Sequence, residues 1–213
     1  MYQPDAIAYF EVGGTAYIIS ANEGDARDYD AFSEEARTSS LTLDPSVFPN
    51  ASELLDATQL GRLEITKTLG DTDGDGDYDK LYSYGARSFS IWNGNTGSLV
   101  YDSKNTLETD LHANSSLYPD GRSDAKGAEP EGVAVGEVNG QLIAFIGLER
   151  ADAILTYDIS NPNNPVFLQT LETGDAPEGV LFIPASESPN GSSLLVVSSE
   201  KDGLVKIYQP DKL

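Results

Sequence analysis

The chain has 213 residues and a formal net charge of −22 at pH 7, with 13 Lys and Arg against 35 Asp and Glu. This balance argues against nucleic acid and anionic membranes as partners, because phosphate contacts need clustered Lys and Arg. There is no cysteine, so disulfides and thiol metal sites are excluded. No apolar run approaches the roughly 20 residues that span a bilayer, so we expect no transmembrane segment, and no signal-peptide pattern follows Met1.

The first predicted unit runs from residue 2 to about residue 69. It opens on Pro4-Asp5, and its apolar strand, residues 17–22, ends on Glu23. A long insert, residues 24–60, interrupts this unit, and we expect a short helix within it around residues 52–60.

An acidic segment, residues 71–79, carries the strongest local chemical signal. Oxygen ligands at positions 1, 3 and 5, a glycine at 6 and an acid at 9 follow a calcium loop of the EF-hand type. Position 12 holds Tyr82 instead of a bidentate glutamate, so a distant acid or water is needed to complete the shell. We predict Ca²⁺ here, with another divalent metal or a solvated Asp-Gly turn as alternatives. The predicted ligands are Asp71, Asp73, Asp75, Asp77 and Asp79.

Three further units follow the pattern of short β-strands. The second spans residues 77–103, and the polar segment after it, which contains the only histidine, His112, is predicted to be a loop. The third and fourth units span residues 130–172 and 176–209. Runs rich in β-branched and aromatic residues, bounded by Gly, Pro and Asn, indicate strands. Strands are expected at residues 80–84, 88–93, 98–102, 133–135, 142–148, 154–159, 166–171, 194–199 and 204–208.

The units repeat a motif in which a proline and an acid begin a strand, and an apolar run ending on glutamate follows. Four strands in roughly 40–45 residues are typical of a β-propeller blade. Because first strands of blades line a central channel, the repeated acids should gather there and offer a second metal or ligand site. We expect two acidic layers, one of Asp5, Glu131 and Glu178 and the other of Glu23, Glu149 and Glu200.

We therefore predict an all-β fold in which the whole segment, residues 1–213, supplies about four blades of a larger, seven-bladed β-propeller. Four units alone would leave sheet edges and apolar faces exposed. The remaining blades are expected from the same parent protein or from another chain, and a complete four-bladed ring is the alternative.

Four arginines lie near the repeated acids or just before the third unit. An arginine fork binds phosphate or carboxylate in a bidentate manner, and a neighbouring metal can polarise a phosphate ester. The alternative is that these arginines are ion-pair partners of nearby acids. The candidates for anion binding are Arg27, Arg87, Arg122 and Arg150.

Five motifs occur in order and together resemble the choice-of-anchor I family: residues 21–29, 84–92, 122–132, 145–150 and 176–179. That family includes bacterial secreted or surface propeller proteins, some described as atypical alkaline phosphatases, and mesenchyme-specific cell-surface glycoproteins linked to biomineral formation. The resemblance implies a propeller, an extracellular or cell-surface location, and the absence of the family's N-terminal blades. It is weak over residues 105–120, and it implies no catalytic residues.

The leading hypothesis is a calcium-binding, extracellular or cell-surface β-propeller module with a binding or structural role. The alternative is a metal-dependent phosphoesterase, similar to an atypical alkaline phosphatase or a phytase. In that case channel carboxylates would hold the metal and arginines would bind the phosphate ester. The phosphoesterase would have a phosphate ester as its partner, whereas the calcium-binding module would bind a surface ligand.

Overall fold

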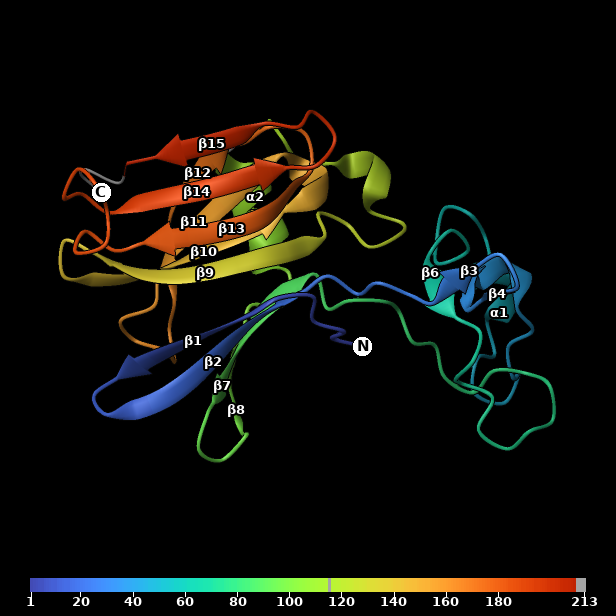
Figure 1. The fold of residues 1–213 in the computed structure, drawn as a ribbon. Helices are drawn as coiled ribbons and strands as arrows, with labels where there is room; N and C mark the ends of the chain where they lie inside the picture. Colours follow the sequence, from blue (N-terminus) through green and yellow to red (C-terminus); the bar gives the residue numbers. More distant parts are fainter. Residues whose placement is uncertain (115, 210–213) are drawn as a thin grey trace.

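The computed structural model describes residues 1–114 and 116–209 and gives them an all-β fold (Figure 1), as the sequence predicts. Three antiparallel sheets contain most of the strands, and two two-stranded ribbons lie in the insert. Residue 115 and residues 210–213 of the predicted segment lie outside the described residues.

The first sheet joins two parts of the chain that the sequence analysis assigned to separate units. Its order is β1-β2-β7-β8, and Asn22 at the end of β2 pairs with Ser88 at the start of β7. The division into units 2–69 and 77–103 is therefore wrong, because both belong to one sheet and the insert extends over residues 23–87. The strands are β1 (Ile7–Val12), β2 (Thr15–Asn22), β7 (Ser88–Asn93) and β8 (Leu99–Asp102).

The insert lies beside the stacked sheets (Figure 1) and is largely irregular. The strand predicted at residues 80–84 is absent, because this segment makes only a single bridge, between Ser83 and Ile65. The predicted helix at residues 52–60 is shorter, and Asp56 accepts hydrogen bonds from Thr58 in the turn that follows it. The elements are β3 (Asp28–Tyr29), β4 (Phe32–Ser33), β5 (Glu35–Arg37), η1 (Thr38–Ser40), α1 (Ala51–Leu54) and β6 (Glu64–Thr66).

The second and third sheets are meanders in chain order. A tight turn at Asn139-Gly140, both with positive φ, joins the first two strands of the second sheet, as its sequence predicts. The second sheet contains β9 (Pro130–Val138), β10 (Gln141–Leu148), β11 (Ala153–Asp158) and β12 (Val166–Glu172). The third contains β13 (Pro177–Ile183), β14 (Leu194–Ser199) and β15 (Val205–Tyr208).

The second sheet is buried on both faces because it lies between the other two. Successive side chains of a strand point to opposite faces, and in β10 both sets are apolar. Ala144 and Ile146 pack toward the first sheet with Phe89, whereas Ile143 and Phe145 pack toward the third sheet. The ring of Phe145 stacks on Phe182 of β13, with centroids 5.6 Å apart.

The first strands of the three sheets are neighbours, since β9 contacts both β1 and β13. Gly132 permits the approach of β9 to β13, because a Cβ at this position would lie 2.5 Å from the carbonyl oxygen of Glu178. Neighbouring first strands are typical of propeller blades arranged around an axis. The propeller itself stays a prediction.

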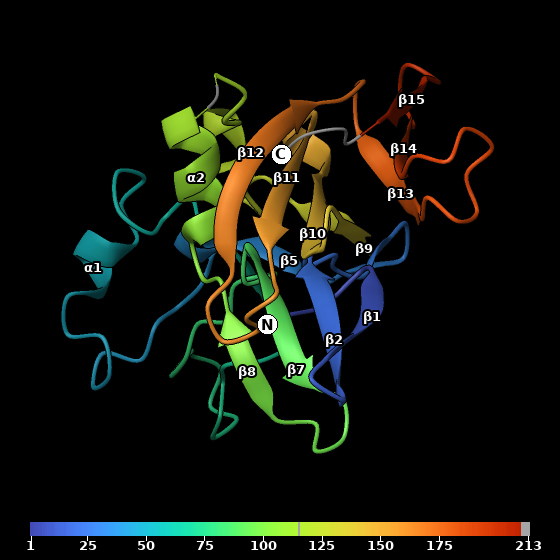
Figure 2. The ribbon, with the colours of Figure 1, turned by 90° about the vertical axis from the view of Figure 1, so that its left-hand side faces the viewer.

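A helix, α2 (Thr106–Asn114), covers the outer side of β12 (Figure 2) where the sequence analysis expected a polar loop. Leu107 and Leu111, one helical turn apart, are fully buried, and His112 is exposed. Two 3-10 turns, η2 (Asp120–Arg122) and η3 (Glu149–Ala151), adjoin the second sheet. Over the described ranges, no helix combines the length and apolar composition needed to cross a membrane.

Candidate metal sites

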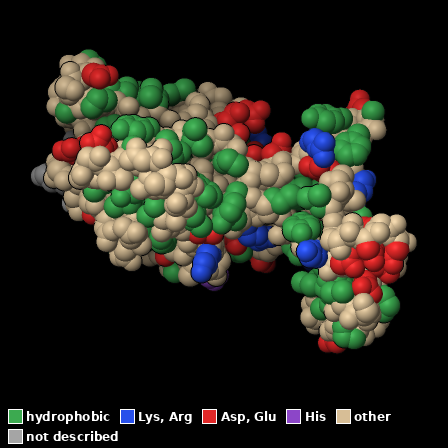
Figure 3. Space-filling model, turned by 90° about the horizontal axis from the view of Figure 1, so that it is seen from below, with side chains coloured by type: hydrophobic (Ala, Val, Ile, Leu, Met, Phe, Trp, Pro, Cys, Tyr) green, Lys and Arg blue, Asp and Glu red, His purple; other side chains and the backbone are tan. Residues whose placement is uncertain are grey.

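The acidic loop, residues 71–79, lies in the insert, and backbone contacts place it beside a distant acid. Tyr78 forms a parallel bridge with Leu43, and the N–H of Asp44 donates to the carbonyl of Tyr78 at 3.1 Å. The loop is closed at its base by Gly70, whose carbonyl accepts from Asp79 at 2.9 Å. Asp44 therefore stands where the sequence analysis required an acid from elsewhere. Figure 3 shows acidic side chains gathered over the insert.

Carboxylate oxygens in this region form two groups that share one residue. In each group the oxygens lie within 4.8 Å of one another, and Asp79 belongs to both. Of the five predicted ligands, Asp75 is the one in neither group. The groups are Asp71, Asp73 and Asp79, and Asp44, Asp77 and Asp79.

Hydrogen bonds orient several of these carboxylates. Asp71 accepts from the N–H of Gly74 at 2.7 Å and from that of Gly76 at 3.1 Å, and Asp79 accepts from the N–H and hydroxyl of Thr72. The bonds from Thr72 lower the pKa of Asp79. By contrast, the charge of Asp75 raises the pKa of Asp73. The loop thus combines a fixed carboxylate with neighbours that repel one another.

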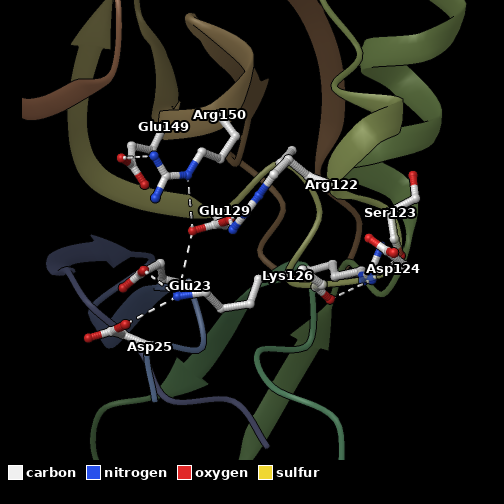
Figure 4. Close-up of polar contacts among 12 residues, drawn as sticks. Glu23, Asp25, Arg122, Ser123, Asp124, Lys126, Glu129, Glu149 and Arg150 are labelled. Carbon is white, nitrogen blue, oxygen red and sulfur yellow. Dashed lines mark hydrogen bonds and ion pairs between the residues drawn. The ribbon is translucent and has the colours of Figure 1, made fainter. Parts of the chain in front are cut away.

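A second acidic group is buried where the sheets converge on the insert. We call Glu23, Glu129 and Glu149 the buried carboxylate cluster, because their oxygens also lie within 4.8 Å of one another (Figure 4). Glu23 follows β2, Glu149 follows β10, and Glu129 precedes β9. Glu129 is 0% exposed and has a φ of 53°, a left-handed conformation that turns the chain just before Pro130. Its counterparts before Pro4 and Pro177, Gln3 and Ala176, have the same sign of φ.

Three basic side chains surround this cluster. Arg122 donates to Glu129 Oε1 through Nε at 3.1 Å and through Nη2. Lys126 Nζ lies 3.4 Å from Glu23 and 3.1 Å from Asp25. Burial by itself would lower the pKa of Lys126, but the charges of these acids and Glu129 raise it.

Arg150 completes the ring of basic groups. It pairs with Glu149 at 2.8 Å, and its Nε lies 3.4 Å from Glu129 Oε2. Burial, the first cause, raises the pKa values of Glu23 and Glu149 despite the nearby cations.

The structure brings most of the repeated acids together, but not all. Burial raises the pKa of Glu131 to about 8, and the charges of its neighbours add to this shift. These neighbours are acids from both predicted layers: Glu149, Glu23, Asp5 and Glu178.

Glu200 occupies a different environment from its predicted layer partners. Its N–H donates to Ala176, as that of Glu149 donates to Glu129, yet its side chain is exposed and is not one of the clustered ligands. Glu129, and not Glu200, is the third carboxylate beside Glu23 and Glu149. The repeat gave no signal for it, because the equivalent positions hold Gln3 and Ala176.

The four candidate arginines are paired with acids or carbonyls. Arg27 forms a fork with Glu34, and Arg87 donates to the carbonyls of Ser123 and Ala125 and lies 3.4 Å from Glu108. Arg122 and Arg150 belong to the ring around Glu129 described above. These contacts follow the ion-pair alternative of the sequence analysis.

These features define an acidic all-β domain with carboxylate groups on its insert and between its sheets. The model of the choice-of-anchor I domain matches residues 1–162, so the chain belongs to this family. Gigasin-3a of Magallana gigas is 31% identical over an alignment of 182 residues that covers 70% of this chain and 64% of Gigasin-3a. A mesenchyme-specific cell surface glycoprotein of Strongylocentrotus purpuratus is 23% identical over an alignment of 225 residues, gaps included, that covers 84% of this chain and 29% of the glycoprotein. The chain thus spans less than two thirds of either relative.

Proposed function

We propose that this domain is a calcium-binding module of an extracellular or cell-surface protein and that the acidic loop is its calcium site. The observation that carries the proposal is the position of Asp79 between two groups of carboxylates. Ca²⁺ takes six to eight oxygen ligands at about 2.3–2.6 Å, so oxygens within 4.8 Å of one another suit a common ion. The surface location is supported by the relative from Strongylocentrotus purpuratus, which is a cell surface glycoprotein.

Calcium would neutralise the repulsion among these aspartates and fix the loop against the segment around Asp44. Its dissociation constant for Ca²⁺ should fall near the roughly 10⁻⁴–10⁻³ M of extracellular calcium modules, because the loop is mostly exposed. Calcium binding would therefore have a structural role in the parent protein, because a rigid insert presents a defined surface to a ligand.

Titration calorimetry with CaCl₂ tests this proposal on two matched variants. Asp79→Asn removes a ligand shared by both groups, whereas Asp75→Asn removes the same charge from the same loop outside either group. We expect Asp79→Asn to weaken binding by more than about 100-fold, since even outer partners of a metal site change affinity by about 10–100-fold. Asp75→Asn should weaken it less than about tenfold. Equal affinities for the two variants would refute the site.

We also propose that additional sheets, as in a propeller, cover the outer faces of the first and third sheets. The support is the exposure of apolar side chains there, among them Ile7 and Tyr9 on β1 and Leu181 and Ile207 on the third sheet. The phosphoesterase alternative gains no support from the candidate arginines, because their guanidinium groups already contact carboxylates and carbonyls.

A further inference from the structure

We propose that the buried carboxylate cluster, Glu23, Glu129 and Glu149, is a second site for a hard divalent cation such as Ca²⁺. This site is separate from the acidic loop and does not depend on it. It would join the insert to the first and second sheets, because its three ligands come from these different parts of the chain.

The first argument is an unsatisfied oxygen. Glu129 is 0% exposed, and its Oε2 has no hydrogen-bond partner in the part of the chain that the structure describes. The nearest cationic nitrogens, Arg150 Nε and Lys126 Nζ, lie 3.4 and 3.6 Å away. Arg150 Nε is likewise buried without a hydrogen bond. Metal coordination is one of the few ways to satisfy the remaining lone pairs of a buried carboxylate oxygen that forms ion pairs but no hydrogen bond.

The second argument is charge. Three basic side chains, Arg122, Lys126 and Arg150, pair with four acids around this point, so the acids outnumber their basic partners. A bound cation would offset the remaining negative charge. The four acids are Glu23, Asp25, Glu129 and Glu149.

The third argument is the size and chemistry of the donor set. All three ligands are carboxylates, which favour hard cations over copper or zinc. Oxygens on opposite sides of a calcium ion are about 4.6–5.2 Å apart, given its bond lengths. The three carboxylate oxygens lie within 4.8 Å of one another, so one such ion can contact all of them. Figure 4 shows the side chains of Glu23, Glu129 and Glu149 gathered from separate backbone segments, with nitrogens of Arg150 and Lys126 between them.

The direct test is an anomalous difference map from crystals of the unmodified protein soaked in MnCl₂, a probe with the same preference for oxygen ligands. We expect a peak among Glu23, Glu129 and Glu149, and this result does not require the acidic loop to bind. A map with a peak at the loop alone, or with none, would overturn the proposal for the cluster.

A solution test separates this site from the loop by using Asp79→Asn as the background. In that background, Glu149→Gln should weaken the remaining Mn²⁺ or Ca²⁺ binding about tenfold or more. Glu108→Gln is the matched control, since Glu108 is also partly buried and paired with an arginine, Arg87, outside the cluster. Equal binding by these two variants would contradict the proposal. Circular dichroism establishes whether each variant is folded. If Glu149→Gln does not fold, the anomalous map of the unmodified protein decides the question.

Discussion

At the scale of single residues, Glu34 illustrates how one buried carboxylate organises the insert. Its oxygens accept from the N–H of Arg27 at 2.9 Å and from the guanidinium of the same residue, and its carbonyl accepts from Tyr84 and Lys67. These bonds hold three separate parts of the insert together. The backbone N–H of Arg27, and then its side chain, lower the pKa of Glu34.

We expect Glu34→Gln to lower the free energy of unfolding at pH 7 by roughly 1.5–3 kcal/mol, the range of a hydrogen bond to a charged group. A lowered carboxyl pKa stabilises the fold above the ordinary value of 4.5 and loses this effect as pH falls through the lowered value. The difference between variant and native protein should therefore shrink as pH falls below 4.5. Urea unfolding across pH 3–7 measures it.

The adjacent Glu35 supplies a control, because its pKa is shifted in the opposite direction from that of Glu34. Burial, followed by the charge of Glu64, raises its pKa, so its ionisation destabilises the fold as pH rises above 4.5. Glu35→Gln should be neutral or stabilising at pH 7. The same pH dependence in both variants would show that these carboxyls do not act through their local partners.

The candidate sites were predictable where a local pattern carried the information. Alternating aspartates and Gly76 identify the acidic loop from sequence, because neighbours along the chain are also neighbours in space. Asp44 was unpredictable, since it reaches the loop through a bridge between Leu43 and Tyr78. Glu129 was missed for another reason, as its repeat counterparts are not acidic.

At the scale of elements, Gly132 sets the separation of β9 and β13. An added Cβ would lie 2.5 Å from Glu178 O and 2.7 Å from Val180 Cγ2, closer than real contacts allow. Gly132→Ala should therefore destabilise the protein by roughly 1–3 kcal/mol, the usual effect of overpacking. Urea unfolding at constant pH is the measurement.

Gly121 provides the matched control for this substitution. A Cβ there meets nothing within 4 Å, and its φ is not positive. Gly121→Ala should be neutral or slightly stabilising, because alanine reduces the freedom of the unfolded chain. Similar losses for the two alanine variants would argue against a tight contact between the first strands.

Strands of the second sheet were predictable because β10 is apolar on both faces and Asn139-Gly140 marks the turn that joins it to β9. The first sheet was not, since β2 and β7 pair across the whole insert and no local period indicates that pairing. Helix α2 was missed because only Leu107 and Leu111 mark its buried side. Its remaining residues are largely polar and resemble a loop.

At the scale of the whole molecule, the outer face of the third sheet exposes apolar side chains that a closed fold would cover. Leu181, Val205 and Ile207 are 57%, 64% and 64% exposed. Leu181 and Ile207 both pair with Val196, so they share the face opposite the core. A contiguous apolar face of this kind supports the proposal that another sheet covers it.

We expect residues 1–213 alone to associate as concentration rises, once salt reduces the repulsion of the net negative charge. Sedimentation at about 0.5 M NaCl, where the screening length is well under about 8 Å, measures this association. Leu181→Lys with Ile207→Lys should reduce it. Val47→Lys, an exposed apolar position in the insert, should not. A monomer at all concentrations would contradict the covered-face model.

The pairing of Asn22 with Ser88 brings the two ends of the insert together. Opposed residues on antiparallel strands are only about 4.5–5.5 Å apart, so residues 23–87 leave and rejoin the first sheet at neighbouring points. The strands of that sheet can therefore tolerate changes in the length of the insert. Such changes must spare Glu23, Asp25 and Arg87, because these residues contact Lys126 and the carbonyls of residues 123 and 125.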